Sequence, residues 1–218
     1  MANGTTKTKR ITVLYDPLCG WCYGATPAFG RLAAMPDVDL HLCPTGLFSR
    51  DGARPLAGFA AHAWANDQRI EQLSGQRFTT QYRDQVLGDA KAMLDSGPAT
   101  TALTAASLSG GAHAELEALA AIQAARYVDG RDVTNVDVLA DILRSVGLDA
   151  AATALSSNDA ALRANVESRT RNGQKALSAV GARGVPTVIV GEPGRGMLIP
   201  SDHLYAKLDE LRRDVEAR

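Results

Sequence analysis

Residues 11–24 read ITVLYDPLCGWCYG, and this stretch decides the fold. The apolar run from Ile11 to Tyr15 is typical of a buried strand, and a segment that can be helical follows from about Gly20 to Ala34. Cys19 and Cys22 therefore lie in the first turn of the predicted helix. There the unpaired N–H groups and the helix dipole stabilise a thiolate, so we expect Cys19 to be nucleophilic near neutral pH. Cys22 can then attack the mixed disulfide that Cys19 forms.

A zinc site, or a pair of buried thiols, is the alternative interpretation of these cysteines. A four-thiolate site needs a second pair, and the only other cysteine of the chain is Cys43. His41 could complete a set of three cysteines and one histidine, but the spacing matches no usual zinc pattern. We therefore predict reversible dithiol chemistry without a metal or an organic cofactor, and we expect Cys43 to be a buried inert thiol.

Length and composition narrow the class of protein. The 218 residues fit one domain, or one domain with a large insertion, and 45% hydrophobic residues can form a substantial core. The 23 basic and 24 acidic residues nearly cancel and no basic run is present, so we expect no nucleic-acid partner. No segment approaches the ~20 apolar residues that span a bilayer, and residues 1–10 lack the apolar core of a signal peptide. We expect a cytoplasmic protein, or a periplasmic or secreted one if a signal peptide was removed.

The predicted strands fall into two groups at the ends of the chain. A strand over 38–43 follows the first helix so closely that the two strands must be parallel. Near the other end, 187–190 and 197–199 form a hairpin, and a helix begins with Ser201 as its N-cap. This last helix shows its apolar side chains on one face, namely Leu204, Leu208, Leu211 and Val215. The order βαβ and then ββα is that of the α/β thioredoxin fold.

The segment between these groups is rich in alanine and contains no convincing strand. Its clearest helix is predicted over 134–146, where Thr134 and Asp137 resemble a capping box. Two more are predicted over 113–128 and 159–180. We therefore divide the chain into a split thioredoxin-like domain, residues 1–50 plus 181–218, and an inserted all-helical domain, residues 51–180.

The sequence GVPT at 184–187 stands directly before the third strand. The first two strands are parallel and end at one edge of the sheet, whereas the third runs antiparallel to them and begins at that edge. Pro186 is therefore expected beside Cys19 in space.

Taken together, CGWC at 19–22 and VPT at 185–187, on either side of a helical insertion, resemble the DsbA-type thiol-disulfide oxidoreductases. The neighbourhood YDPLCGWCYG at 15–24 is similar to their cytoplasmic-type, FrnE-like branch. This resemblance implies that Cys19 is the exposed nucleophile, that Cys22 is the buried resolving thiol and that the Val185–Pro186 bond is cis. It also implies active-site support from Gly20, Trp21, Val185 and Pro186.

Four residues near the two motifs are candidates for binding an extended substrate. The backbone of Val185 and the adjacent Thr187 would pair with a substrate strand. Trp21 either offers an apolar surface to the substrate or packs on the insertion. Tyr23 is either a substrate contact or a packing residue. The loop over 45–54 starts at the same edge, and either covers the site or is a plain surface loop.

Two departures from the family pattern concern proton transfer and charge. Thioredoxin and DsbA carry a buried acid six residues before the first cysteine, where this chain has Val13. Asp16 is the nearest substitute, although it is also well placed to accept backbone N–H groups of the turn. DsbA itself has a histidine between its cysteines, whereas Gly20 and Trp21 offer no cation. We therefore expect a milder oxidant than DsbA.

The predicted function is that of a protein disulfide oxidoreductase or isomerase, acting on protein or peptide thiols and disulfides. A glutathione-type or a thioredoxin-type electron donor is the candidate redox partner. One alternative is a glutathione-using transferase or isomerase, similar to the kappa-class transferases and the 2-hydroxychromene-2-carboxylate isomerases. Those relatives have a serine where Cys19 stands. The other alternative is a non-enzymatic, redox-sensitive binding protein.

Overall fold

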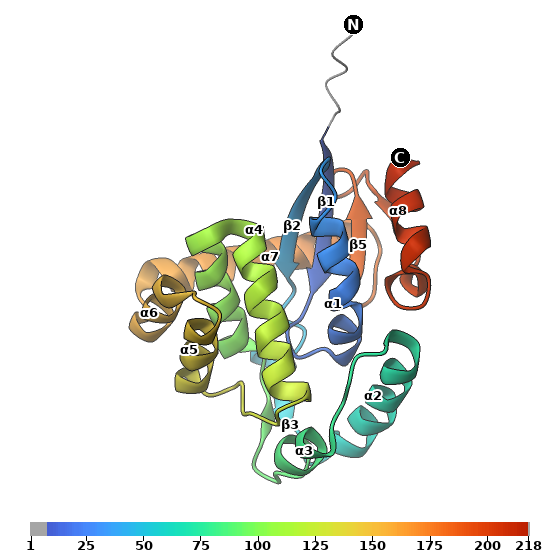
Figure 1. The fold of residues 1–218 in the computed structure, drawn as a ribbon. Coiled ribbons are helices and arrows are strands. Elements are labelled where there is room, and N and C mark those ends of the chain that lie inside the picture. The colour runs from blue at the N-terminus through green and yellow to red at the C-terminus, as the bar shows by residue number, and fades with distance from the viewer. Residues whose placement is uncertain (1–7, 218) are drawn as a thin grey trace, which may run out of the picture.

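A four-stranded sheet forms the centre of the computed structural model, which describes residues 8–217 (Figure 1). Its order is β2-β1-β5-β6, with β1 parallel to β2, antiparallel to β5, and β5 antiparallel to β6. These strands are β1 (Lys9–Tyr15), β2 (Val38–Pro44), β5 (Thr187–Val190) and β6 (Met197–Leu198). The predicted α/β thioredoxin fold is therefore confirmed.

Helices connect the strands and fill the insertion between β2 and β5. Helix α1 (Gly20–Ala33) joins β1 to β2, and α8 (Leu208–Glu216) closes the chain. The helices of the insertion lie beside the sheet and beyond the edge where β1 ends (Figure 1). They are α2 (Ala60–Ser74), α3 (Thr80–Tyr82), α4 (Gly97–Tyr127), α5 (Val136–Ser145), α6 (Asp149–Ser157) and α7 (Ala160–Ala179).

The insertion differs from the prediction in one strand pair and in one additional helical segment. Short strands β3 (Arg54–Pro55) and β4 (Met93–Leu94) pair antiparallel, although no strand was expected there. Two residues per strand are too few for an alternating pattern. Helix α4 consists of two helical parts, because the backbone is non-helical at Gly110 and Gly111. The second part begins close to the predicted start near His113, whereas the first part, from Gly97, was not predicted.

Two predicted helix starts are also corrected. Asn135 caps α5 through bonds from the backbone N–H groups of Asp137 and Val138, while Thr134 bonds Asp132 instead, so the predicted capping box is wrong. Ser201 opens only a 3-10 turn that ends at Leu204, and the final helix begins at Leu208. The expected apolar face persists across this break, since Leu204, Leu211 and Val215 are all buried.

A buried ion pair, which we call the anchor, joins the insertion to the sheet. Glu115 of α4 is bound by Arg169 of α7, whose Nη2 donates to both carboxylate oxygens at 2.6 Å. Tyr15 of β1 donates its hydroxyl to Glu115 at 2.7 Å, and Arg169 also donates to the carbonyl of Leu42 in β2. The anchor therefore ties two insertion helices to the two parallel strands, β1 and β2.

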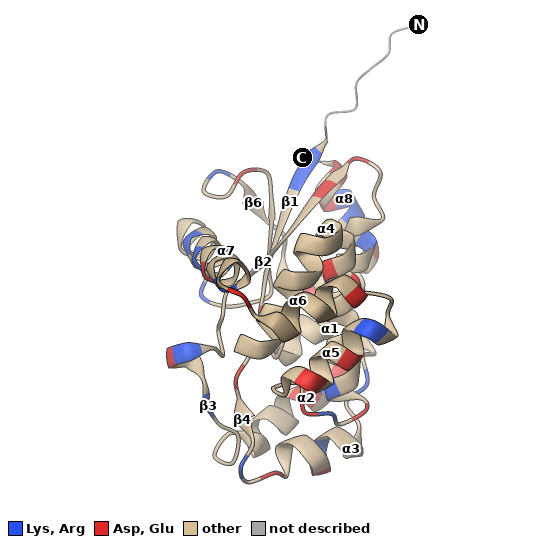
Figure 2. Ribbon diagram, turned by 90° about the vertical axis from the view of Figure 1, so that its left-hand side faces the viewer, with Lys and Arg blue, Asp and Glu red and all other residues tan. Residues whose placement is uncertain are grey.

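Charge is mixed over the described elements, with Lys and Arg interspersed among Asp and Glu (Figure 2). No helix in the described part of the chain has the length and apolar character needed to cross a membrane.

Candidate active site

Asp16 shapes the turn that leads from β1 into α1. Its Oδ1 accepts the N–H of Leu18 at 2.9 Å. Its Oδ2 accepts the N–H of Phe48 at 3.2 Å and the hydroxyl of Ser96 at 2.7 Å. Burial raises the pKa of this carboxyl, against these bonds. Asp16 thus has the turn-forming position considered in the sequence, and it also fastens the 45–54 loop to the motif.

Cys19 and Cys22 are both free thiols, and they differ in accessibility. Cys19 stands in extended conformation at the N-cap of α1 and is 6% exposed, whereas Cys22 is 0% exposed. Burial raises the pKa of the Cys22 thiol well above its usual value, and the neighbouring Cys19 sulfur adds to this shift. The helix start therefore leaves the Cys19 thiol slightly accessible, less than the exposed nucleophile that the resemblance implies, and encloses the Cys22 thiol completely.

Pro186 lies where the topology predicts, at the start of β5 and next to the motif. The Val185–Pro186 peptide bond is cis. The Cys19 thiol donates to the carbonyl oxygen of Val185 at 3.6 Å. Thr187 pairs with Leu14 in the sheet, and its hydroxyl donates to the carbonyl of Gly184. The two motifs, 164 residues apart from Cys22 to Pro186 in the sequence, thus meet at one sheet edge.

Gly20 permits the close approach of α2 to the motif. A Cβ on Gly20 would lie 2.6 Å from Oδ1 of Asp67 and 3.2 Å from Cδ1 of Ile70. A Cβ on Gly24, one turn further, would lie 2.5 Å from Cγ2 of Ile70. The glycines of α1 therefore bring a carboxylate of the insertion next to the residue that follows Cys19.

An aromatic cluster supports the motif from below. The ring of Tyr23 stacks on that of Tyr127 with centroids 4.7 Å apart and meets the edge of Phe78 at 5.1 Å. Tyr127 donates its hydroxyl to the carbonyl of Leu18 at 2.8 Å. Tyr23 is only 5% exposed, so it takes the packing position rather than that of a substrate contact.

Trp21 lies at the side of the motif. Its ring meets the edge of Tyr205 at 5.5 Å, and the hydroxyl of Tyr205 donates to the carbonyl of Trp21 at 3.1 Å. The guanidinium of Arg69 in α2 lies 5.9 Å from the Trp21 ring. Trp21 therefore packs on both the C-terminal segment and the insertion, and its remaining surface faces the cavity described next.

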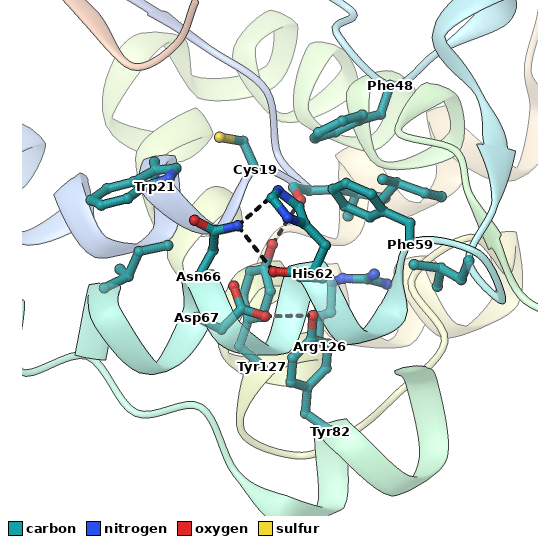
Figure 3. Close-up of a pocket in the computed structure, with 16 residues that line it drawn as sticks. Cys19, Trp21, Phe48, Phe59, His62, Asn66, Asp67, Tyr82, Arg126 and Tyr127 are labelled. Atoms are coloured by element: carbon teal, nitrogen blue, oxygen red, sulfur yellow. Dashed lines mark hydrogen bonds between the residues drawn. The ribbon is translucent and has the colours of Figure 1, made fainter. Parts of the chain in front are cut away.

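A cavity of about 190 Å³ opens beside Cys19, between the motif and the insertion (Figure 3). Phe48 brings the 45–54 loop into its wall, so that loop covers part of the site. Most of the wall is apolar or aromatic, as is usual for ligand sites. The side chains labelled around it are Cys19, Trp21, Phe48, Phe59, His62, Asn66, Asp67, Tyr82, Arg126 and Tyr127.

Buried charged groups line the cavity opposite Cys19. Asp67 is 4% exposed and its Oδ2 accepts the hydroxyl of Tyr82 at 3.1 Å. Burial raises the pKa of Asp67 to about 7, against the Tyr82 hydrogen bond and the charge of Arg126. Arg126 is 2% exposed, lies over the rings of Tyr82 and Tyr127, and its Nε has no hydrogen-bond partner among residues 8–217.

The sequence gives no sign of these cavity residues. Asp67, Tyr82 and Arg126 come from three separate helices and belong to no motif. Gly20 is the one residue of the motif whose lack of a side chain indicates close packing, but the sequence does not show which residue packs there.

Cys43 and His41 lie apart from this cavity. Cys43 on β2 is only partly buried, so the expectation of a buried thiol is corrected. Burial raises the pKa of its thiol, while nearby Arg169 lowers it. His41 pairs with Asp39 at the surface. Among the described residues, no group of His, Cys, Asp and Glu side chains is arranged to hold a metal ion.

Comparison with known proteins agrees with this geometry. The family model of the DSBA-like thioredoxin domain matches residues 10–212. The chain belongs to this family. It is thus a member of a family of thiol-disulfide oxidoreductases, as the resemblance implied. No curated protein matches the chain.

Several solved structures share the fold over nearly the whole chain. Cytosolic disulfide reductase DsbM from Pseudomonas aeruginosa is 31% identical, with a TM-score of 0.84 over 95% of this chain and 97% of that one. The same protein with GSH matches at 32% identity, a TM-score of 0.80, and 95% and 98% coverage. A putative protein disulfide isomerase from Nitrosomonas europaea is 21% identical, with a TM-score of 0.77 and 97% coverage of each chain, and shows the fold alone.

Proposed function

We propose that this protein is a cytoplasmic disulfide reductase that uses Cys19 as nucleophile and Cys22 as resolving thiol. The observation that carries the proposal is the difference in exposure between the two thiols. Cys19 borders a cavity, whereas Cys22 is fully enclosed. Cys22 can therefore react only with a sulfur that is already bound to Cys19.

The reaction follows from this arrangement. The Cys19 thiolate attacks a substrate disulfide, forms a mixed disulfide and releases one substrate thiol. Cys22 then attacks the Cys19 sulfur, which releases the second substrate thiol and leaves a Cys19–Cys22 disulfide. The backbone of Val185 and Thr187 beside the motif would hold an extended substrate by strand pairing. Two molecules of a small thiol return the pair to its reduced state.

The relatives support the reducing direction and the small thiol. DsbM is described as a cytosolic disulfide reductase, and one of its structures contains GSH. We therefore propose glutathione as electron donor and the cytoplasm as location. In an isomerase the same residues would act, but the mixed disulfide would be resolved by a substrate thiol.

Turnover of insulin disulfides with glutathione as donor tests the proposal. Cys19→Ser is expected to abolish reduction. Cys22→Ser is expected to accumulate a mixed disulfide between Cys19 and the substrate, detectable by mass spectrometry, and Cys43→Ser serves as the matched control. Absence of turnover in the wild-type protein, or a trapped adduct on Cys43, would contradict the assignment.

The reduction potential of the Cys19–Cys22 pair tests separately whether the protein reduces or oxidises its substrates. A Cys19–Cys22 potential near about −270 mV suits a reductant, and one near about −120 mV suits an oxidant. Equilibration with glutathione buffers of known ratio, followed by alkylation of the free thiols, gives this value. A strongly oxidising potential would rule out the reductase.

A further inference from the structure

Asp67 is a buried carboxyl that the dithiol mechanism described so far does not use. It projects from α2 into the cavity that Cys19 also lines (Figure 3). Its Oδ1 lies 2.6 Å from the position that a Cβ of Gly20 would take, directly after Cys19 in the chain. The two groups thus face one small cavity from opposite elements.

The other acid near the motif is unsuited to exchange protons with a substrate. Both oxygens of Asp16 accept hydrogen bonds, Oδ1 from the N–H of Leu18 and Oδ2 from Phe48 and Ser96. Asp16 is also 0% exposed and does not line the cavity. Oδ2 of Asp67 accepts the hydroxyl of Tyr82, and Oδ1 is the oxygen turned toward Gly20. A cavity of about 190 Å³ can admit a sulfur and its neighbouring carbons between Asp67 and Cys19.

We propose that Asp67 carries the proton of the exchange reaction at Cys19, an inference that rests on the proposed function. Cys19 attacks as a thiolate, and its sulfur bonds to the nearer sulfur of the substrate disulfide. The S–S bond of the substrate breaks, and the departing sulfur takes up the electron pair. Protonated Asp67 donates its proton to that departing sulfur, so the products are a mixed disulfide on Cys19, a neutral thiol and the Asp67 carboxylate, which then takes up a proton from water.

The surroundings of Asp67 suit it to this task. A group that gives and takes a proton works best when its pKa lies near the working pH. The pKa of Asp67 is about 7 because burial raises it, while the Tyr82 bond and the Arg126 charge hold it down. The other titratable and charged groups that line the cavity are Cys19, His62, Tyr82, Arg126 and Tyr127, and α2 itself also carries Arg69 and Glu71.

A leaving-group comparison tests the proposal. An aromatic disulfide releases an acidic thiol that departs without a proton donor, whereas oxidised glutathione releases a basic one. Asp67→Asn is expected to slow the reaction of reduced protein with oxidised glutathione at least tenfold, and with the aromatic disulfide less than threefold. A merely structural role would slow both equally, and that result would overturn the proposal.

The pH profile gives a second readout. The rate with oxidised glutathione should show an inflection near pH 7 that Asp67→Asn removes. In the wild-type protein the hydrogen bond from Tyr82 lowers the pKa of Asp67. Tyr82→Phe removes this bond, so it should raise that pKa and move the inflection to higher pH. His62→Gln is the matched control, since His62 is an ionisable side chain exposed on the same cavity wall.

The outcomes separate this proposal from the reductase function. If the inflection disappears in His62→Gln and persists in Asp67→Asn, the assignment to Asp67 is wrong while the reductase function stands. If the wild-type protein reacts with neither disulfide, the reductase function itself fails.

Discussion

The insertion meets the thioredoxin-like half at two places that use buried charge in opposite ways. At the anchor, Glu115 is held by both a guanidinium and a tyrosine hydroxyl, and Arg169 also reaches a β2 carbonyl. At the cavity, Asp67 has one hydroxyl donor, and the Nε of Arg126 has no hydrogen-bond partner within the described chain. Buried polar groups are normally satisfied, so the two contacts differ in how completely their buried charges are paired.

Removal of the anchor arginine is expected to give the largest effect on stability. Arg169→Ala leaves the Glu115 carboxylate, whose side chain is 1% exposed, without its counter-charge. Breaking a buried pair in this way costs about 3–5 kcal/mol, to be measured by urea unfolding. Arg171→Ala, an exposed position two residues along the same helix, is the control and should change little. A loss below about 1 kcal/mol would show that the anchor is not structural.

Removal of the charge at Asp67 is expected to raise the free energy of unfolding at high pH, whereas Arg169→Ala lowers it. The folded-state pKa of Asp67 is about 7, above the ~3.9 of an unfolded aspartate. Stability from this group is therefore fully present below about pH 4 and is lost as pH rises through about 7. Asp67→Asn removes this loss, so the variant should be more stable than the wild type at pH 8, by up to about 4 kcal/mol at ~1.4 kcal/mol per pKa unit.

Urea unfolding at pH 4 and pH 8 checks this expectation. The difference between Asp67→Asn and the wild type should be small at pH 4 and large at pH 8. Asp209→Asn is the control because its side chain is 97% exposed. Equal stability of the Asp67→Asn variant and the wild type at both pH values would mean that folding does not raise the pKa of Asp67.

Two glycines of α1 test how tightly α2 packs against the helix beside the cavity. Gly20→Ala places a methyl group 2.6 Å from the Asp67 carboxylate, so we expect a loss of about 1–3 kcal/mol in the free energy of unfolding. Gly30→Ala, in the same helix, meets no atom within 4 Å and should gain about 0.5–1 kcal/mol. Thermal unfolding of both variants measures the contrast, and a stabilising Gly20→Ala would show that α2 is free to move away.

The sequence predicts the thioredoxin-like half well because local pattern and function coincide there. Local pattern predicts the strand before Cys19, and the spacing of Cys19 and Cys22 predicts the dithiol chemistry. The order of strands then brings the two motifs together without further information. Their geometry is confirmed by the hydrogen bond between Cys19 and the Val185 carbonyl and by the cis bond at Pro186.

The insertion was predicted less well because long-range packing decides its details. Gly110 and Gly111 do interrupt α4, since both have non-helical backbone angles, but the helical part before them was not predicted. Asp67 and Tyr82 lie 15 residues apart and Arg126 another 44 beyond, so no local spacing connects them. A partly charged cavity wall of this kind is visible only once the helices are in place.

Cys43 is expected to give the smallest effect, and it tests whether the two places are chemically separate. Its thiol lies on β2 near Arg169 and Glu115, which puts it on the anchor side, away from the cavity lining. Cys43→Ala should therefore leave insulin reduction within about twofold of the wild-type rate. Loss of a small, partly buried side chain should lower the free energy of unfolding by only about 1 kcal/mol. Turnover assays and urea unfolding of the same preparation measure both quantities. A collapse of turnover in a folded variant would instead make Cys43 a third redox thiol, and the anchor would then take part in the chemistry.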